Sequence, residues 1–183
     1  MIRRPPRSTL SPSSAASDVY KRQMYEYMRR RASVWEGYTP VMHPLTTDHT
    51  IVRTDIFPKL LELLTYNKHH EMPQKVFEVG DVVVNGKNRL RLAACVTHVR
   101  ANFSEIRSYV QAVMRELNLR WNVEESNDEA FIDGRRADII VNGKRIGVFG
   151  EVHPEVLEKF DLTTPVAAFE VDLTSILDCG EVL

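Results

Sequence analysis

Two Asn-Gly pairs constrain the fold of this chain more than any other feature of its sequence. Asn85-Gly86 and Asn142-Gly143 each follow a valine and precede a lysine. An Asn-Gly pair supplies the positive φ angles that a tight hairpin turn requires. The runs on either side of each turn are therefore predicted to be antiparallel strands: 75–84 with 89–98, the turn spanning 85–88, and 137–141 with 145–149. The repeated Val-Asn-Gly-Lys sequence reflects shared turn chemistry rather than an internal repeat.

A helix is predicted in front of the first hairpin. Thr54 or Asp55 is expected to be its N-cap, Pro58 suits its first turn, and the helix should end near Asn67. The apolar residues at helical spacing are Ile56, Phe57, Leu60, Leu61, Leu63 and Leu64. This stripe is interpreted as core, and part of it would lie in an interface if the chain pairs with another subunit.

Further helix signals lie between and after the hairpins. Asn102 is expected to cap a second helix, with Glu105 as the reciprocal partner of a capping box. Pro154 suits the first turn of a short helix that ends at Phe160, and a last strand is expected at 166–173. The stripe of the second helix consists of Ile106, Val110, Val113 and Leu117. Hairpins interrupted by helices predict an α+β domain, with helices on a mainly antiparallel sheet.

The first 23 residues differ in kind from the rest of the chain. They contain three prolines, five serines and almost no large apolar residues, and their net charge is +4, against −5 for residues 24–183. Such a segment is predicted to be disordered. Its sequence resembles a translated sequencing adapter fused to a gene fragment, so residues 1–23 are interpreted as non-native and residues 24–183 as the domain. The alternatives are a basic tail and an arm for nucleic-acid binding or organelle targeting.

The next residues carry weaker signals. The pattern predicts a short helix over 24–35, whose basic run 29–31 is interpreted as a solvated face. Pro40 and Pro44 then favour a connector or edge strand over 38–45.

Composition limits the class of protein. With 43% hydrophobic residues, 183 residues can bury one substantial core. We find neither an apolar run of about 18 residues nor a secretory signal, so a cytoplasmic location is predicted. The acidic balance of residues 24–183 disfavours free-standing nucleic-acid binding through general electrostatic attraction. Cys95 and Cys179 have no partner at metal-ligand spacing and are expected to be reduced and structural.

Residues from about 40 to 183 resemble the β subunit of the archaeal and eukaryotic type of phenylalanyl-tRNA synthetase. The resemblance rests on six stretches that follow in the order of the family: VRTDIFPKLL at 52–61, NKHH at 67–70, VFEVGDV at 76–82, NFSEIRSYV at 102–110, IGVFGEVHPEVL at 146–157 and AFEVDL at 168–173. The bacterial form would continue into an anticodon-binding domain.

The resemblance implies a class II aminoacyl-tRNA synthetase-like fold, the catalytic-like module of the subunit. It also implies a partner, the catalytic α subunit, in an α2β2 heterotetramer that charges tRNA(Phe) with phenylalanine using ATP and Mg²⁺. An editing domain and an acidic motif that shares magnesium with the α subunit are expected to lie upstream of the present sequence.

The resemblance also indicates that this module does not catalyse the reaction. Class II chemistry places arginines from motifs 2 and 3 on the ATP phosphates, where negative charge develops. The strand at the motif 2 position reads FEVGD at 77–81, and AAFEVDL at 167–173 takes the place of motif 3. No arginine follows Arg145, and Glu170 and Asp172 would repel a triphosphate. We therefore assign no catalytic, cofactor-binding or metal-binding residue, and expect no adenylation activity and no bound cofactor.

Three other groups of residues invite a functional interpretation. His69-His70-Glu71 suggests a metal site, but adjacent histidines point apart in a strand or turn and no third ligand lies at suitable spacing. His153 beside Glu151 resembles an acid/base pair, although a polar cap at a helix entrance explains it better. Arg135-Arg136 with Asp133 and Asp138 suggests a phosphate or tRNA contact, for which a salt-bridged sheet edge is the commoner explanation.

The sequence therefore predicts a non-catalytic structural module of the β subunit. One alternative is a free-standing α+β interaction domain of the same descent, which would bind a protein or small metabolite in its former active-site cleft. A second alternative is an RNA-binding arm in residues 1–23 attached to a scaffold domain.

Overall fold

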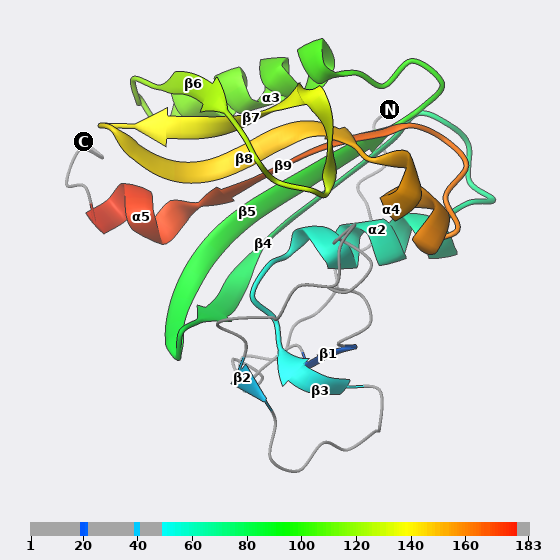
Figure 1. Ribbon diagram of the computed structural model, residues 1–183, viewed down its shortest axis with the longest axis horizontal. Coiled ribbons are helices and arrows are strands. Elements are labelled where there is room, and N and C mark those ends of the chain that lie inside the picture. Colours follow the sequence, from blue (N-terminus) through cyan, green and yellow to red (C-terminus); the bar gives the residue numbers. More distant parts are fainter. Residues whose placement is uncertain (1–18, 22–38, 41–48, 179–183) are drawn as a thin grey trace, which may run out of the picture.

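The computed structural model describes residues 19–21, 39–40 and 49–178 (Figure 1). The helix predicted at 24–35 lies outside these residues, as do residues 1–18, 22–23 and 41–45 and Cys179. Among the described residues no helix is long and apolar enough to cross a membrane.

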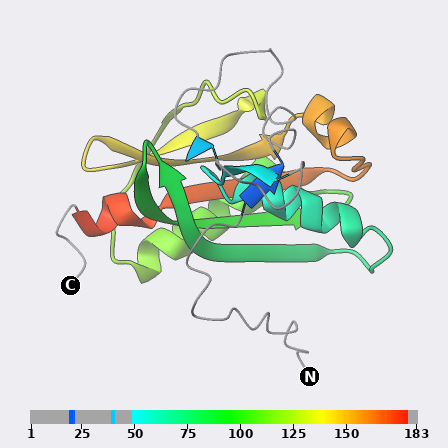
Figure 2. The ribbon, with the colours of Figure 1, turned by 90° about the horizontal axis from the view of Figure 1, so that it is seen from below.

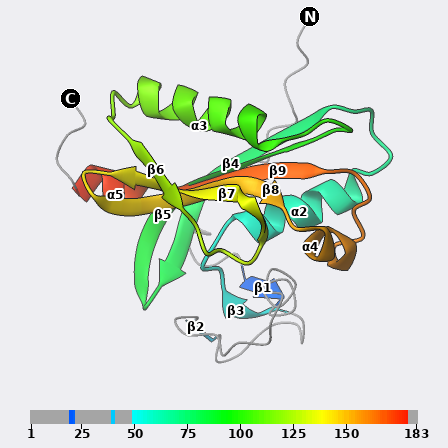
Figure 3. The same ribbon diagram turned by 45° about the horizontal axis from the view of Figure 1, so that its top comes forward.

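A six-stranded antiparallel sheet forms the centre of the fold, as the hairpin signals predict (Figures 1 and 3). The strand order is β4-β5-β9-β8-β7-β6. Strand β9, the last one in the described part of the chain, therefore lies between the two hairpins and joins them into one sheet. The strands are β4 Gln74–Val84, β5 Lys87–Thr97, β6 Asn122–Glu125, β7 Phe131–Val141, β8 Lys144–Val152 and β9 Val166–Asp172.

Both Asn-Gly turns have the backbone that the sequence predicts. Asn85 and Gly86 have φ angles of 52° and 72°, and Asn142 and Gly143 have 51° and 74°. Each loop consists of two residues, so Lys87, predicted in the first turn, begins β5 instead. A turn with positive φ at both central residues matches the twist of the strands that it joins, which explains the long, regular pairing of β4 with β5.

Helices α3 (Phe103–Glu116) and α5 (Leu173–Asp178) cover one face of the sheet. The Asn102 side chain accepts a hydrogen bond from the Glu105 backbone N–H at 3.0 Å, so the predicted cap is confirmed. Glu105 does not complete the capping box, because its carboxylate lies 2.7 Å from Nε2 of His98. The residues fully buried on this face, here called the α3-side core, include Ile106, Val110, Met114, Ile139, Phe149 and Val171.

Helices α2 (Phe57–Tyr66) and α4 (Pro154–Lys159) cover the opposite face (Figure 3). Strand alternation separates the two layers: Ala167 belongs to the α3-side core, and Ala168 belongs to the core under α2. The rings of Phe57 and Phe131 stack with centroids 5.4 Å apart. The α2-side core includes Ile56, Leu60, Leu61, Leu64, Val82, Phe131 and Val156.

Several elements were not predicted from the sequence. Strand β6 has four residues and helix α5 has six, so both are too short for a periodic signal in the sequence. A second, three-stranded sheet has the order β1-β3-β2 and consists of Val19–Lys21, His49–Val52 and Thr39–Pro40. Strand β2 is an edge strand, one of the two forms expected for this stretch. Strand β1 contradicts the predicted disorder for three residues of 1–23, because it pairs antiparallel with β3.

Candidate functional site

A cluster of charged side chains lies on the α2 side of the sheet and includes Glu170, which belongs to the stretch in the place of motif 3. Glu170 on β9 pairs in register with Ala93 on β5, so Arg91, two residues before Ala93, lies on the same face. Nη1 of Arg91 lies 3.0 Å from Oε1 of Glu170 and also contacts the carboxylate of Asp55. One guanidinium is therefore held between two carboxylates.

Glu170 also caps helix α2 from across the sheet. Its carboxylate accepts hydrogen bonds from the backbone N–H groups of Ile56, at 3.2 Å, and Phe57, at 2.9 Å. The N-cap residue is Ile56, which has no side-chain cap of its own. The prediction that Thr54 or Asp55 caps this helix is therefore wrong. An acidic group is favourable at a helix N-terminus because it satisfies free N–H donors and faces the positive end of the helix dipole.

A second ion pair borders this cluster on the β4 side. Nη1 of Arg53 lies 2.6 Å from Oε1 of Glu78, and Nε of Arg53 donates to the backbone carbonyl of Asp81 at 2.5 Å. Glu78 lies in the stretch that lacks the motif 2 arginine. Gly80 makes room for Arg53, because a Cβ at that position would overlap the Arg53 guanidinium.

Asp172, the other acidic residue of β9, also has partners within the chain. Oδ2 of Asp172 lies 3.3 Å from Nη1 of Arg89, and its Oδ1 accepts the Ser175 backbone N–H at 3.0 Å, in the first turn of α5. Glu170 and Asp172, expected only to repel phosphates, thus hold arginines and helix ends of the same chain.

Burial sets the electrostatics of the cluster. It raises the pKa of Glu170 from 4.5 to about 7, and the Asp55 charge adds to the rise while Arg91 opposes it. Burial works against the charge of Arg91, yet the carboxylates of Asp55 and Glu170 raise its pKa. The thiol of Cys95 is fully buried, and burial raises its pKa. Asp55 and Glu170 therefore hold Arg91 through its Nη1, while its buried Nε has no hydrogen-bond partner among the described residues.

The residues considered from the sequence alone take other positions. His69, His70 and Glu71 are exposed in the turn after α2, and residues 49–178 contain no group of three His, Cys, Asp or Glu that could hold a metal ion. His153 accepts the Glu155 backbone N–H at 3.2 Å as the N-cap of α4.

Glu151 does not contact His153. Its carboxylate accepts the Phe103 backbone N–H at 2.9 Å and lies 2.8 Å from Nη1 of Arg135. Arg136 pairs with Asp133 at 2.7 Å, and Asp138 pairs with Arg145 at 2.7 Å. These arginines therefore lie in a salt-bridged part of the sheet.

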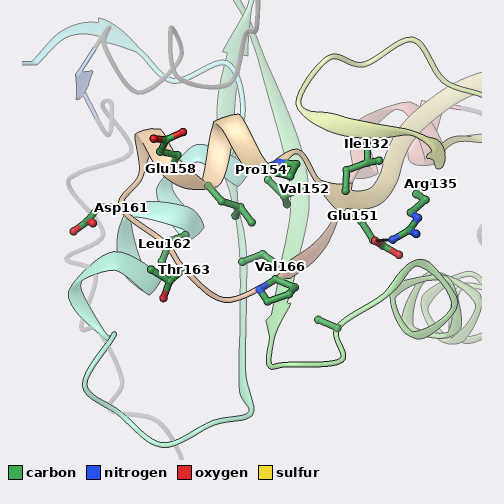
Figure 4. A pocket seen from close by; sticks show the side chains of 13 residues that line it. Ile132, Arg135, Glu151, Val152, Pro154, Glu158, Asp161, Leu162, Thr163 and Val166 are labelled. Atoms are coloured by element: carbon green, nitrogen blue, oxygen red, sulfur yellow. Dashed lines mark hydrogen bonds and ion pairs between the residues drawn. The ribbon is translucent and has the colours of Figure 1, made fainter.

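A pocket of about 450 Å³ lies at the end of the sheet, next to α4 (Figure 4). Ile132, Val152 and Leu162 contribute apolar wall, while Arg135 and Glu151 lie at one end and Glu158 and Asp161 at the other. Nothing in the sequence signals this pocket, because its walls come from segments far apart in the chain.

The sequence analysis did not predict the Arg91–Glu170 cluster. One sequence signal does point to it: Glu170 is an acidic residue in the apolar run VAAFEV, and a buried acid needs a partner.

Comparisons with known proteins agree with this geometry. A family model described as the phenylalanyl-tRNA synthetase β chain CLM domain matches residues 18–173. The phenylalanine–tRNA ligase β subunit of Archaeoglobus fulgidus is 75% identical over 160 residues, which cover 87% of this chain and 29% of that protein. The corresponding subunit of Methanococcoides burtonii is 52% identical over 150 residues, covering 82% of this chain and 27% of the relative.

A solved structure shows the same fold. A pyrrolysyl-tRNA synthetase of Desulfitobacterium hafniense superposes with a TM-score of 0.71 at 12% identity, over 88% of this chain and 60% of that one. The antiparallel sheet with its flanking helices is therefore a class II synthetase fold. The chain spans less than a third of the curated relatives that it matches, and it belongs to the family of archaeal-type phenylalanine–tRNA ligase β subunits, of which it contains the catalytic-like (CLM) domain.

Proposed function

We propose that this domain is a non-catalytic structural module that pairs with the catalytic α subunit of phenylalanine–tRNA ligase. In this proposal the cytoplasmic α2β2 enzyme binds ATP, Mg²⁺ and tRNA(Phe), and residues 49–178 form no catalytic, cofactor or metal site. The observation that carries the proposal is the pairing of Arg91 with both Asp55 and Glu170 on the α2 side of the sheet.

Arg91 is the centre of that argument. A class II enzyme needs a positive charge that is free to follow the charge that develops on the α-phosphate. Arg91 is instead held by Asp55 and Glu170. To release it would leave two carboxylates unpaired, one of them buried, and breaking a buried pair costs about 3–5 kcal/mol. A triphosphate would also meet the negative charge of these carboxylates.

The proposed partner follows from the family. The subunit names of the relatives indicate a multi-subunit ligase, and the chain is 75% identical to one of these subunits over its matched length. The contacts of Glu170 with Arg91 and with the start of α2 hold this helix on the sheet, which supports a role of the domain as a rigid partner surface.

The first test measures the activity of the chain by itself. The purified 183-residue chain should give no phenylalanine-dependent ATP–pyrophosphate exchange above the enzyme-free background, whereas an intact ligase of a relative measured in parallel should give exchange. Exchange by the purified chain, retained after a further purification step, would contradict the non-catalytic assignment.

Pairing is tested in the context of a complete subunit. Residues 49–178 of this chain replace the matched segment of the Archaeoglobus fulgidus β subunit, and the α subunit of that organism is co-expressed. The two subunits should co-elute and show exchange activity. A chimera that elutes alone, while the unaltered relative pairs normally, would contradict the pairing role.

One observation favours the second candidate, a free-standing interaction domain. The pocket beside α4 has a volume in the range of small-molecule sites. If that candidate is correct, the chimera fails to pair, and the isolated chain is a monomer to which the α subunit makes no difference.

A further inference from the structure

The two Asn-Gly turns share one chemistry that neither the fold nor the proposed function uses. Asn85-Gly86 and Asn142-Gly143 both lie between a valine and a lysine, and both turns are exposed. The amide nitrogen after an asparagine can attack the asparagine side chain, and glycine hinders this attack least because it has no Cβ. The sequence around the reacting atoms is therefore the same in both turns, and only the structure distinguishes them.

The reaction is a deamidation that needs no reactant other than water. The backbone nitrogen of Gly86 forms a bond to Cγ of Asn85, the bond from Cγ to the side-chain nitrogen breaks, and ammonia leaves with the proton of the glycine nitrogen. Water then opens the resulting five-membered imide at either carbonyl. One product is aspartate, and the other is isoaspartate, in which the main chain runs through Cβ.

The turn geometry restrains this reaction. Asn85 and Gly86 have φ angles of 52° and 72°, and ring closure rotates the main chain between them out of the turn. The backbone N–H groups of Gly86 and Gly143 donate no hydrogen bond within residues 49–178, so neither nitrogen has to be released from an acceptor. The rate at each turn therefore follows the fraction of molecules in which that turn is locally open.

Main-chain hydrogen bonds hold the two turns to a similar extent. Val83, two residues before Asn85, donates its N–H to the carbonyl of Arg53 at 2.8 Å. Ile140, two residues before Asn142, lies on β7 and pairs with strands on both sides. These contacts do not favour one turn over the other.

Burial does distinguish the two turns. Val141, directly before Asn142, is 1% exposed, and Ile146 on the other arm of that hairpin is 3% exposed. In the β4–β5 hairpin, residues 83–90 are all half-buried or exposed, and the nearest buried side chain is Val82. The end of this hairpin projects away from α2 and α3 (Figures 1 and 2). Opening the second turn thus brings buried apolar side chains into water, whereas opening the first does not.

We propose that Asn85 is a site of spontaneous deamidation in the folded protein and reacts faster than Asn142. The aspartate product adds a negative charge at the end of the β4–β5 hairpin. The isoaspartate product adds one atom to the main chain of the turn and so disturbs the pairing of Val84 with Lys87. The inference depends neither on pairing with the α subunit nor on the absence of catalysis.

The test follows both turns in one sample. The purified 183-residue chain is incubated in warm, mildly alkaline buffer and digested with trypsin at intervals. Asn85 lies in peptide 76–87 and Asn142 in peptide 137–144, and both peptides end in Val-Asn-Gly-Lys. Mass spectrometry measures the replacement of the amide by a carboxyl group, and chromatography separates the two products. Asn85 should react about tenfold faster than Asn142, the ratio that a difference of about 1.4 kcal/mol in opening free energy produces.

Two controls separate chemistry from structure. In guanidinium chloride, where the chain is unfolded, both asparagines should react at the same rate because their neighbours are the same. Asn118, in peptide 116–120, is exposed with a φ of 53° but is followed by Leu119, so it should stay largely unmodified.

The remaining outcomes contradict the inference. Equal rates in the folded chain, or a faster reaction of Asn142, would mean that burial around the turn does not govern its opening. The same preference for Asn85 in guanidinium chloride would assign the difference to sequence instead of structure. An Asn85 that stays unmodified while the unfolded chain reacts would mean that the folded turn does not open.

Discussion

Glu170 joins three elements that are far apart in the chain. It lies on β9, contacts Arg91 on β5 and accepts backbone N–H groups at the start of α2. A carboxylate in this position holds the helix on the sheet. Burial disfavours its ionised form and raises its pKa. The same residue therefore positions α2 and pairs with Arg91.

The pH dependence of stability follows from the raised pKa of Glu170. Between about pH 4.5, the usual pKa of a glutamic acid, and pH 7, the folded chain keeps a proton that the unfolded chain has lost. This contribution to stability is full below pH 4.5 and is lost as the pH rises through 7. The Glu170→Gln variant lacks this loss. The free energy of unfolding of the variant, relative to that of the native chain, should therefore rise by about 1–3 kcal/mol between pH 4.5 and pH 8, since one pKa unit is worth about 1.4 kcal/mol.

Urea unfolding of both proteins at several pH values measures this difference. Glu158→Gln, at an exposed position, is the matched control for replacing a glutamate by glutamine. Parallel curves for Glu170→Gln and the native chain would show that Glu170 ionises as an ordinary carboxylate.

At the scale of the elements, the close pairing of β8 with β9 depends on glycine. Gly147 pairs with Val171, and a Cβ at residue 147 would overlap the backbone carbonyl oxygen of Glu170 and lie 3.0 Å from Cα of Val171. Backbone atoms in a paired strand cannot turn aside as a flexible side chain can. The strand that carries Glu170 is thus set in place by its neighbour.

Gly147→Ala should lower the free energy of unfolding by about 1–3 kcal/mol, the range for overpacking in a well-packed interior. The measurement is equilibrium urea unfolding followed by far-ultraviolet circular dichroism. Lys144→Ala, an exposed position on the same strand, should change stability by less than about 0.5 kcal/mol. Equal stabilities of the two variants would show that β8 and β9 separate at no cost.

At the scale of the whole molecule, one sheet carries two cores. The α2-side core and the α3-side core lie on opposite faces and share strands β5, β8 and β9. Neither face can lose its strands without exposing the other, so the described domain is expected to unfold as one unit.

This coupling predicts that a destabilising substitution on one face also shifts the unfolding transition of the other face. Leu61→Ala removes a fully buried side chain under α2 and should cost about 2–5 kcal/mol. The readout is the fluorescence of Trp121, which packs on Phe149 in the α3-side core, in a Trp35→Phe background. The urea midpoint of Trp121 should fall with that of circular dichroism. A Trp121 transition left unchanged by Leu61→Ala would show two independent units.

Features set by neighbouring residues were predictable from the sequence. The two hairpins follow from Asn-Gly pairs, and the start of α3 follows from Asn102, because a turn or a cap is completed within a few residues. The family resemblance is confirmed by the comparisons and places the chain among class II folds. The assignment of residues 1–23 as non-native stays a prediction, although the family match begins at residue 18 and Val19–Lys21 form a strand.

Features set by contacts between distant residues were decided only by the tertiary structure. The sequence favours Thr54 or Asp55 as the cap of α2, but the cap is Glu170, 114 residues from Ile56. The central position of β9 and the pocket beside α4 are of the same kind. The sequence by itself determined the two hairpin turns and the longer strands and helices, since these depend on local backbone chemistry. The partners of Glu170 and Arg91 depend on which strands become neighbours, and only the assembled sheet decides that.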